Sequence, residues 1–227
     1  MDKIAIIVAG GTGTRMGMSM PKQFIEVNEK PIVVHTITTF LQAYPEMEIV
    51  LVLPAEFVER GKEIAQQFFP RTEIAIVAGG ATRFHSVQNG LVLVHKPSIV
   101  FVQDAVRCLL STQLIHNCYE QAMDKGAAIP TVSARDSIRI IDGQSSKVVN
   151  RDDIRIVQTP QTFLSEILLP AFRQDYSEEF TDEATVVEKS GKPVFLIEGE
   201  VTNIKITFPI DLVIAEKFLE ERSKVIV

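Results

Sequence analysis

Cysteine is scarce in this sequence: its 227 residues include two, Cys108 and Cys118, and neither belongs to a CxxC motif. The four histidines are scattered along the chain. A structural zinc site needs closely spaced cysteine and histidine ligands, and a disulfide framework needs many cysteines, so both are excluded. We expect two reduced thiols in a cytoplasmic protein.

Long apolar segments and an excess of positive charge are also missing. No apolar run approaches the roughly 18 residues that a membrane span requires, and the first residues lack the pattern of a secretory signal peptide. The formal net charge is -6 at pH 7, whereas nucleic-acid-binding domains are usually basic. We therefore expect neither a membrane nor a nucleic acid as a partner, and any anion must be bound by locally placed positive charge.

The chain does contain an ordinary globular composition, with 46% hydrophobic and 23% charged residues, in which apolar strand-like runs alternate with helical patterns. Such alternation predicts a Rossmann-like α/β fold, in which helices sandwich a mainly parallel sheet. Ser111 is expected to cap a helix that ends at Lys125, before Gly126. The predicted strands are 3–9, 48–53, 73–77, 99–103, 127–132 and 194–197, and the other predicted helices are 31–44, 55–69, 83–94, 165–173, 181–190 and 208–222.

The alternation breaks between residues 135 and 158, where short runs flank a turn at 142–146. This pattern predicts a β-hairpin, and its position predicts an arm that projects from the sheet. No linker or low-complexity segment divides the chain, so we expect residues 1–227 to form one domain. In open α/β sheets, ligands bind outside the carboxyl ends of the strands, and the loops predicted at those ends carry the unusual residues.

The first of these loops, AGGTGTRMGMSMPKQF (residues 9–24), combines glycines with the positive charges of Arg15 and Lys22. It lacks the GxxxxGK[ST] pattern of a P-loop, because Gly17 is followed by Met18 and not by lysine. A dinucleotide-binding turn is disfavoured too, since the GxGxxG fingerprint fails and no acidic residue ends a second strand about 20 positions later. We interpret the segment as a long basic flap that binds the phosphates of a nucleotide.

The pattern AGGTGTRMG…PKQF resembles the opening signature of the sugar- and polyol-phosphate nucleotidyltransferases. Its PKQ form is most similar to the 2-C-methyl-D-erythritol 4-phosphate cytidylyltransferase family of the non-mevalonate isoprenoid pathway, and ribitol-5-phosphate cytidylyltransferases come next. The resemblance implies that Arg15 and Lys22 are catalytic residues that hold a triphosphate. It also implies that the nucleotide is bound at Ala9, Gly10, Gly11 and Gly13.

Two further loops agree with this resemblance. In GGATRFHSVQNGL (79–91), a Gly-Gly turn precedes a predicted helix, and backbone amides there can read the edge of a base. In FVQDAVRCL (101–109), Asp104 directly follows an apolar strand, where a lone carboxylate suits Mg²⁺ whose other ligands are waters and phosphates. The resemblance implies nucleotide contacts from Gly80, Arg83, Ser86 and Asp104, with Mg²⁺ bound at Asp104.

The second of these loops departs from the family's usual HDAARP or HDAVRP form. Gln103 stands in place of the histidine and Cys108 in place of the proline, while Asp104 and Arg107 are retained. Because Asp104 and Arg107 are both retained, the expected metal role of Asp104 stands.

The arm and the segments after it supply the expected acceptor contacts. RDSIR, NRDDIRIVQTPQTF and TDEATVVE resemble family segments in which the arm, here at about residues 135–158, exchanges between two subunits. We therefore expect a homodimer, and we also expect Thr181 to cap the helix that it precedes. The resemblance implies that the polyol phosphate contacts Arg107, Ser137, Arg151, Thr159 and Thr181.

The segment VTNIKITFP (201–209) holds one lysine between isoleucines, and alternation predicts a strand with Lys205 on the opposite face from its neighbours. The resemblance implies that Lys205 holds the transferring phosphate. The implied reaction converts CTP and 2-C-methyl-D-erythritol 4-phosphate to the CDP-linked alcohol and pyrophosphate. Ribitol 5-phosphate as acceptor, an NAD-binding oxidoreductase and a nucleotide-sensing module are the alternatives, and the joint presence of Lys22 and Lys205 disfavours the last.

Overall fold

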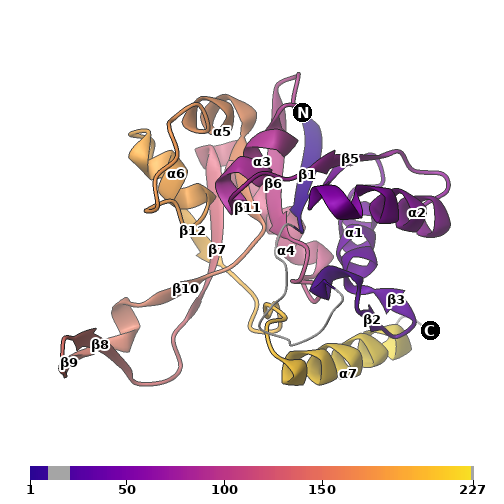
Figure 1. The fold of residues 1–227 in the computed structure, drawn as a ribbon. Coiled ribbons are helices and arrows are strands. Elements are labelled where there is room, and N and C mark those ends of the chain that lie inside the picture. The colour runs from indigo at the N-terminus through magenta and orange to yellow at the C-terminus, as the bar shows by residue number, and fades with distance from the viewer. Residues whose placement is uncertain (10–20, 226–227) are drawn as a thin grey trace.

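The computed structural model describes residues 1–9 and 21–225, and in that part of the chain the central feature is an eight-stranded sheet (Figure 1). Its strands are β1 (Asp2–Val8), β4 (Glu48–Leu53), β5 (Ile74–Ala78), β6 (Ser98–Asp104), β7 (Ala127–Ser133), β10 (Arg155–Val157), β11 (Gln161–Leu164) and β12 (Leu196–Glu198). They lie in the order β10-β7-β11-β6-β1-β4-β5, and β12 pairs with β7. The predicted α/β class is confirmed.

Strands β6, β1, β4 and β5 form the parallel part of the sheet. Strands β1, β4 and β6 consist of nearly continuous buried apolar residues, as expected when helices cover both faces of a parallel sheet. The register places Val8, at the end of β1, directly beside Asp104, at the end of β6. The first predicted binding loop therefore starts next to the expected metal-binding carboxylate.

Strand β11 was not predicted. It lies antiparallel between β6 and β7, so β7 joins the parallel strands only through it. The sequence signal is weak because QTFL is short and directly follows Pro160, a residue that usually marks a turn or an edge. The prediction of a mainly parallel sheet still describes the centre of the fold, but this half of the sheet is mixed.

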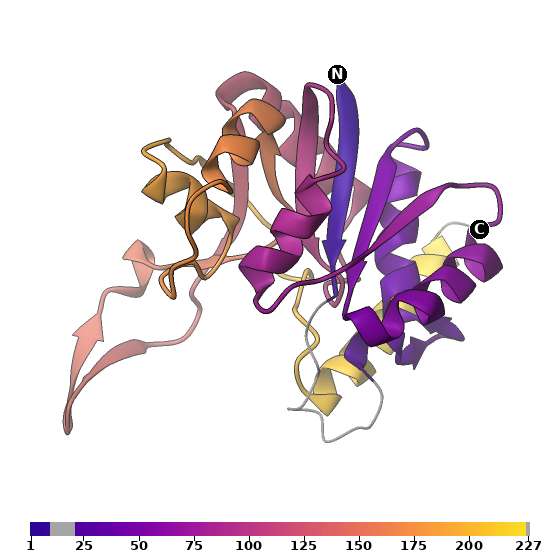
Figure 2. The same cartoon turned by 45° about the horizontal axis from the view of Figure 1, so that its top comes forward.

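Helices cover both faces of the sheet, as Figure 2 shows from a second direction. Alternate residues of β1 divide between the two layers: Ala5 and Ile7 belong to one buried cluster, Ile4 and Ile6 to the other. The first cluster is completed by α1 (Ile32–Ala43), α2 (Val58–Phe68) and α4 (Thr112–Lys125), and the second by α3 (Arg83–Leu91), α5 (Ser165–Ala171) and α6 (Glu183–Lys189). The predicted sandwich is confirmed.

The ends of two helices test the predicted caps. The Ser111 hydroxyl accepts a hydrogen bond from the Leu114 N–H at the start of α4, and Gly126 ends that helix at a φ of 87°, in the left-handed region, as predicted. At α6 the prediction is wrong by one residue. Asp182, and not Thr181, is the N-cap, because its carboxylate accepts from the Thr185 N–H in a capping box.

The C-terminal helix, α7 (Pro209–Val225), packs below the sheet against a small cluster that contains Ile32, Cys108 and Ile206 (Figure 1). Near it lie the 3₁₀ helix η2 (Lys22–Phe24) and the two-stranded ribbon of β2 (Glu26–Val27) and β3 (Lys30–Pro31). None of the helices in 1–9 and 21–225 combines the length and apolar character needed to cross a bilayer.

The predicted arm is present. Strands β8 (Ile138–Asp142) and β9 (Ser145–Val149) pair antiparallel, and the short helix η4 (Arg151–Asp153) leads back to β10. Both views show this hairpin projecting away from the body of the molecule (Figures 1 and 2). Ile140, Ile141 and Val148 on it are 58%, 75% and 72% exposed, so the arm presents apolar surface that this chain does not cover.

Candidate active site

Asp104 is the centre of a charged cluster at the carboxyl end of β6. Its carboxylate is almost buried and contacts three basic side chains from distant parts of the chain. Oδ1 accepts from Arg83 at 3.3 Å from Nε and 3.2 Å from Nη2, while Oδ2 lies 2.8 Å from Lys205 Nζ and 3.8 Å from Arg107 Nε. The Asp104 N–H donates to Thr159 Oγ1 at 3.1 Å, which fixes the end of the strand.

This environment sets the charge of Asp104. Burial by itself raises the pKa of the carboxyl group, but attraction from Arg83 and Lys205 outweighs it and holds the pKa of Asp104 well below its usual range. Asp104 is therefore a permanent negative charge. Basic side chains surround it closely, so the site has the charge pattern expected for binding phosphates.

Arg83 joins Asp104 to a second buried carboxylate. Its guanidinium, at the start of α3, also forms an ion pair with Glu183, the first residue of α6, and Nη2 lies 3.1 Å from Glu183 Oε2. Glu183 is 1% exposed. No local sequence signal indicates this pair, because its two members lie 100 positions apart.

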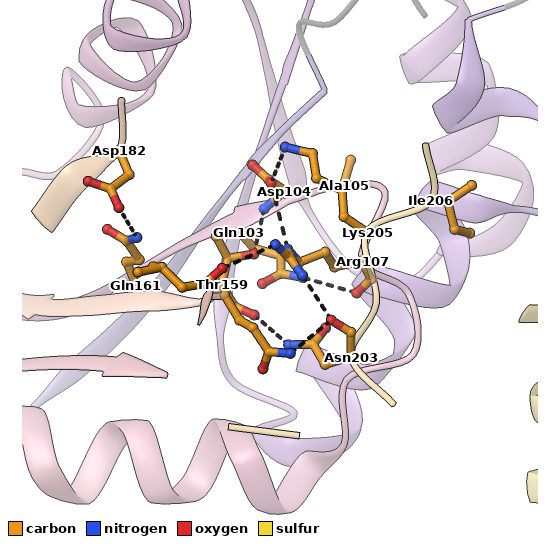
Figure 3. A network of polar contacts seen from close by, with 12 residues as sticks. Gln103, Asp104, Ala105, Arg107, Thr159, Gln161, Asp182, Asn203, Lys205 and Ile206 are labelled. Carbon is orange, nitrogen blue, oxygen red and sulfur yellow. Dashed lines mark hydrogen bonds and ion pairs between the residues drawn. The ribbon is translucent and has the colours of Figure 1, made fainter. Parts of the chain in front are cut away.

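Lys205 does not lie in a strand, so that prediction is wrong. Residues 201–208 form an irregular connection between β12 and α7, which begins with a turn at 201–202. The Ile206 N–H donates to the Val106 carbonyl at 3.0 Å, and Ile206 is fully buried, whereas the Lys205 side chain is 44% exposed. The alternation that suggested a strand therefore reflects one buried anchor beside a lysine that points to Asp104 (Figure 3).

A buried polar network holds this connection in place. Asn203 is fully buried, and its Nδ2 donates to the Thr159 carbonyl at 2.8 Å. The Asn203 carbonyl accepts from Arg107 at 2.9 Å and from Gln158 at 3.3 Å. These bonds tie the Lys205 connection to the residues that flank Asp104 (Figure 3). Asn203 and Gln158 were not predicted as site residues. The sequence signal that could have found them is a polar residue within an otherwise apolar segment.

Lys22 links the opening motif to the segment between β12 and α7 that carries Lys205. It is 8% exposed in η2, and its Nζ donates to the Ile206 carbonyl at 3.3 Å, one residue beyond Lys205. Gln23, which was not predicted as a site residue, donates from Nε2 to the Ala9 carbonyl at 2.8 Å. This bond joins the two ends of the first loop. Gly10, Gly11, Gly13 and Arg15, which were expected to bind phosphate, lie outside the described residues.

The predicted base-reading turn packs tightly against the start of α3. The Gly80 N–H donates to Ser86 Oγ at 3.1 Å, and that hydroxyl donates to the Thr82 carbonyl at 2.9 Å. A Cβ atom at Gly80 would lie 2.4 Å from His85 Cβ, so a larger residue would displace the turn. Ser86 is buried and thus shapes the turn from within.

The predicted acceptor contacts are only partly brought together. Arg107 and Thr159 adjoin Asp104, as described above. Ser137 and Arg151 are exposed at the base of the arm, where Arg151 Nη1 donates to the Arg135 carbonyl at 3.0 Å. Thr181 is exposed beside the cap of α6. Within the described part of the chain, no hydrogen bond or ion pair joins these three residues to the cluster around Asp104.

The donor set at Asp104 limits the kind of metal that the site could hold. Within the described residues, no group of three or more histidine, cysteine, aspartate or glutamate side chains could enclose an ion. A single ionised carboxylate fits Mg²⁺, which binds oxygen and usually keeps waters and substrate phosphates as its other ligands. Asp104 therefore fits a metal that arrives with a nucleotide.

These features define the class of the protein. An ionised aspartate at the carboxyl end of a central parallel strand, with arginine and lysine side chains around it, beside the end of the strand that precedes a glycine-rich segment in the sequence, is the arrangement of an α/β nucleotidyltransferase.

The comparisons with known proteins identify the family. Residues 3–221 match the profile of the 2-C-methyl-D-erythritol 4-phosphate cytidylyltransferase family. The protein of that name from Bacteroides thetaiotaomicron is 43% identical over 219 residues, which are 96% of this chain and 100% of the relative. The chain therefore belongs to the 2-C-methyl-D-erythritol 4-phosphate cytidylyltransferase family, and the family predicted from the sequence is confirmed.

Comparison with solved structures supports the same family. The 4-diphosphocytidyl-2C-methyl-D-erythritol synthase from Anaerococcus prevotii superposes with a TM-score of 0.81 at 27% identity, covering 96% of this chain and 99% of that one. The 2-C-methyl-D-erythritol 4-phosphate cytidylyltransferase from Francisella tularensis gives a TM-score of 0.80 at 30% identity, covering 96% and 100%. The fold, including its mixed half, is that of this enzyme family.

Proposed function

We propose that the chain transfers the cytidylyl group of CTP to 2-C-methyl-D-erythritol 4-phosphate, forming the CDP-linked alcohol and releasing pyrophosphate. Family membership supports the choice of substrates. The observation that carries the proposal is the approach of Lys205 to Asp104, 2.8 Å apart, beside the end of β1. This approach puts a half-exposed ammonium group and a permanent carboxylate where a nucleotide's phosphates would enter.

The chemistry requires positioning and charge neutralisation more than proton transfer. An oxygen of the acceptor's phosphate attacks the α-phosphorus of CTP in line, and the bond to pyrophosphate breaks. A phosphate monoester dianion is already a nucleophile, so the protein need not supply a general base. Lys22 and Arg15 would hold the triphosphate, and Lys205 would stabilise the charge that develops on the α-phosphate.

The nucleotide's base and sugar would lie near the turn before α3. We assign this contact to Gly80 and Arg83, together with the loop that starts at Ala9. Ser86 supports the turn from inside, because its hydroxyl already binds Gly80 and Thr82. The tight packing of Gly80 on His85 supports a rigid backbone edge, which suits recognition of a base.

We propose Mg²⁺ as the cofactor, with Asp104 as its protein ligand. The metal, when bound, would neutralise phosphate charge between the nucleotide and the carboxylate. Lys205 pairs with Asp104 in this structure, and its 44% exposed side chain would turn toward the phosphates when a nucleotide is bound. Arg107 would stay in place, since its Nη1 is bound to the Asn203 carbonyl.

The acceptor site would be completed by a second copy of the chain. Arg107 and Thr159 adjoin Asp104, whereas Ser137 and Arg151 lie on the arm, and Thr181 is exposed at α6. A dimer formed through the exposed apolar residues of the arm would carry the arm of one subunit to the other, so that these residues could share one acceptor. We propose this homodimer, built from a single nucleotidyltransferase domain per chain.

We also propose that the enzyme works in the cytoplasm. Cys108 and Cys118 are both free and buried in the structure. Two unpaired thiols suit a reducing compartment, where disulfides do not persist.

Pyrophosphate release tests the proposal. CTP, UTP, GTP and ATP would each be assayed against 2-C-methyl-D-erythritol 4-phosphate and ribitol 5-phosphate, with Mg²⁺ or with EDTA. We expect release only with Mg²⁺, and kcat/KM highest for CTP with 2-C-methyl-D-erythritol 4-phosphate. Higher kcat/KM with ribitol 5-phosphate would overturn the proposed acceptor, and no release with CTP and either acceptor would overturn the proposed function.

A further inference from the structure

Glu183 is a buried acid for which the reaction proposed above has no use. It begins α6, is 1% exposed and forms its ion pair with Arg83 of α3. Burying a carboxylate and a guanidinium away from water is costly, and hydrophobic residues of similar size would often stabilise a fold equally well. The pair therefore calls for an explanation other than stability.

The charges around Asp104 supply an explanation for the buried pair of Arg83 and Glu183. Asp104 contacts Arg83, Lys205 and Arg107, so three cations compete for one carboxylate. Arg83 is the best placed of them, because its fork holds Asp104 Oδ1 through two nitrogens. Without a second acid, the full charge of Arg83 would fall on Asp104 and would oppose the approach of a metal cation.

The shared guanidinium changes this balance. Arg83 directs Nη1 and Nη2 to Glu183 and Nε and Nη2 to Asp104, so the two acids divide its hydrogen bonds. Glu183 itself is held by the N-terminus of α6, where Asp182 caps the helix and Gln161 accepts from the Ala184 N–H at 2.8 Å. The acid thus has a fixed position at the start of α6, from which it pairs with Arg83.

We infer that Glu183 is a positioning residue that anchors Arg83 and offsets its charge, so that Asp104 keeps enough negative charge to bind a metal–nucleotide complex. This inference rests on the proposed function, since it concerns the carboxylate assigned there to Mg²⁺. It assigns Glu183 no contact with substrate. Its action on the metal passes through Arg83 and Asp104.

The test measures binding without turnover. Isothermal titration gives the Kd of CTP in Mg²⁺ and in EDTA with no acceptor present, and the ratio of the two reports how much the metal tightens binding. For Glu183→Gln, which keeps the size of the side chain, we expect this ratio to fall roughly tenfold. Binding in EDTA should not weaken, because the site becomes more positive.

Two further variants separate this role from a structural one. Arg83→Gln/Glu183→Gln removes both charges, and the metal-dependent ratio should return at least to that of the wild type, because Arg83 no longer competes for Asp104. Asp182→Ala removes the cap of the same helix without touching Arg83, so it should lower the melting temperature and leave the ratio unchanged.

Each outcome has a separate meaning. A wild-type ratio in Glu183→Gln would overturn the inference and leave the proposed function intact. If that variant does not fold, a ratio below wild type in the double variant would overturn it instead. Wild-type protein that binds CTP equally well in Mg²⁺ and EDTA would remove the metal role and the inference together, and wild-type protein that does not bind CTP would overturn the proposed function itself.

Discussion

Lys205 Nζ lies 2.8 Å from Asp104 Oδ2, although the two residues come from distant parts of the chain: Asp104 is the last residue of β6, and Lys205 lies between β12 and α7. Lys22 binds the carbonyl of Ile206, the next residue. Two lysines from separate motifs thus converge on one short connection. Because each ammonium group has a different partner, the two lysines should respond differently to substitution.

Replacing Lys205 should reduce turnover without harming the fold. Its side chain is 44% exposed and, among the described residues, pairs with the Asp104 carboxylate. In Lys205→Ala we expect kcat to fall about 10²- to 10³-fold, the size of effect seen when a group that stabilises transition-state charge is removed. Lys217→Ala, on the exposed face of α7, is the matched control. Steady-state kinetics and thermal melting measure both effects, and near-normal kcat would remove Lys205 from the catalytic residues.

Replacing Lys22 should also lower kcat by orders of magnitude, since we assign it to the triphosphate. Lys22 is buried, so Lys22→Met is the better variant: it keeps most of the volume and removes the charge. The far-ultraviolet circular dichroism should match the wild type. A rise in the KM for CTP with unchanged kcat would show that Lys22 binds the ground state and the transition state equally, contrary to its proposed role.

Much of the fold was accessible from the sequence because its signals are local. The strand Glu48–Leu53, the cap at Ser111 and the stop at Gly126 follow from apolar runs and terminal residues, and all were predicted correctly. Strand β11 was missed since its four residues carry no periodicity, and only the gap between β6 and β7 determines its place. The segment around Lys205 was misread because a single buried isoleucine imitated alternation.

The residues of the site also divide into those that local sequence signals predicted and those that only the folded structure brings together. Asp104 was predicted because an apolar strand ends at it, and its closeness to the first loop follows from parallel pairing. The Arg83–Glu183 pair joins residues 100 positions apart, and Asn203 acts through backbone carbonyls that no sequence pattern marks. Contacts of this kind depend on how α3, α6 and the final connection pack, which is tertiary information.

The pH dependence of kcat/KM should come from the ionisation of the acceptor's phosphate and not from that of Asp104. Because the pKa of Asp104 is depressed in the folded state, its contribution to stability is present above its unfolded pKa of about 4 and is lost only as the pH falls further. The second ionisation of a phosphate monoester lies near pH 6, so kcat/KM should fall about tenfold per pH unit below it. A pH–rate profile checks this, and an acid limb that does not follow the acceptor's own pKa, measured by ³¹P NMR, would contradict it.

The arm should control assembly. A charge placed on its exposed apolar face, as in Ile141→Asp, should convert a dimer to a monomer, because burying an unpaired carboxylate in the contact is unfavourable. Val92→Asp is the control, since Val92 is a 66% exposed apolar residue just after α3 and far from the arm in sequence. Size-exclusion chromatography with light scattering gives the mass. A wild-type monomer, or a dimer unaffected by Ile141→Asp, would exclude the arm as the interface.

Asp104→Asn tests the central claim most directly, because it keeps the shape of the side chain and removes the negative charge that we assign to metal binding. Pyrophosphate release from CTP and 2-C-methyl-D-erythritol 4-phosphate would be followed in wild type and variant across a range of Mg²⁺ concentrations. We predict a loss of at least about a hundredfold in kcat/KM that high Mg²⁺ does not restore. Wild-type turnover in Asp104→Asn at every Mg²⁺ concentration would contradict the assignment of this cluster as the active site.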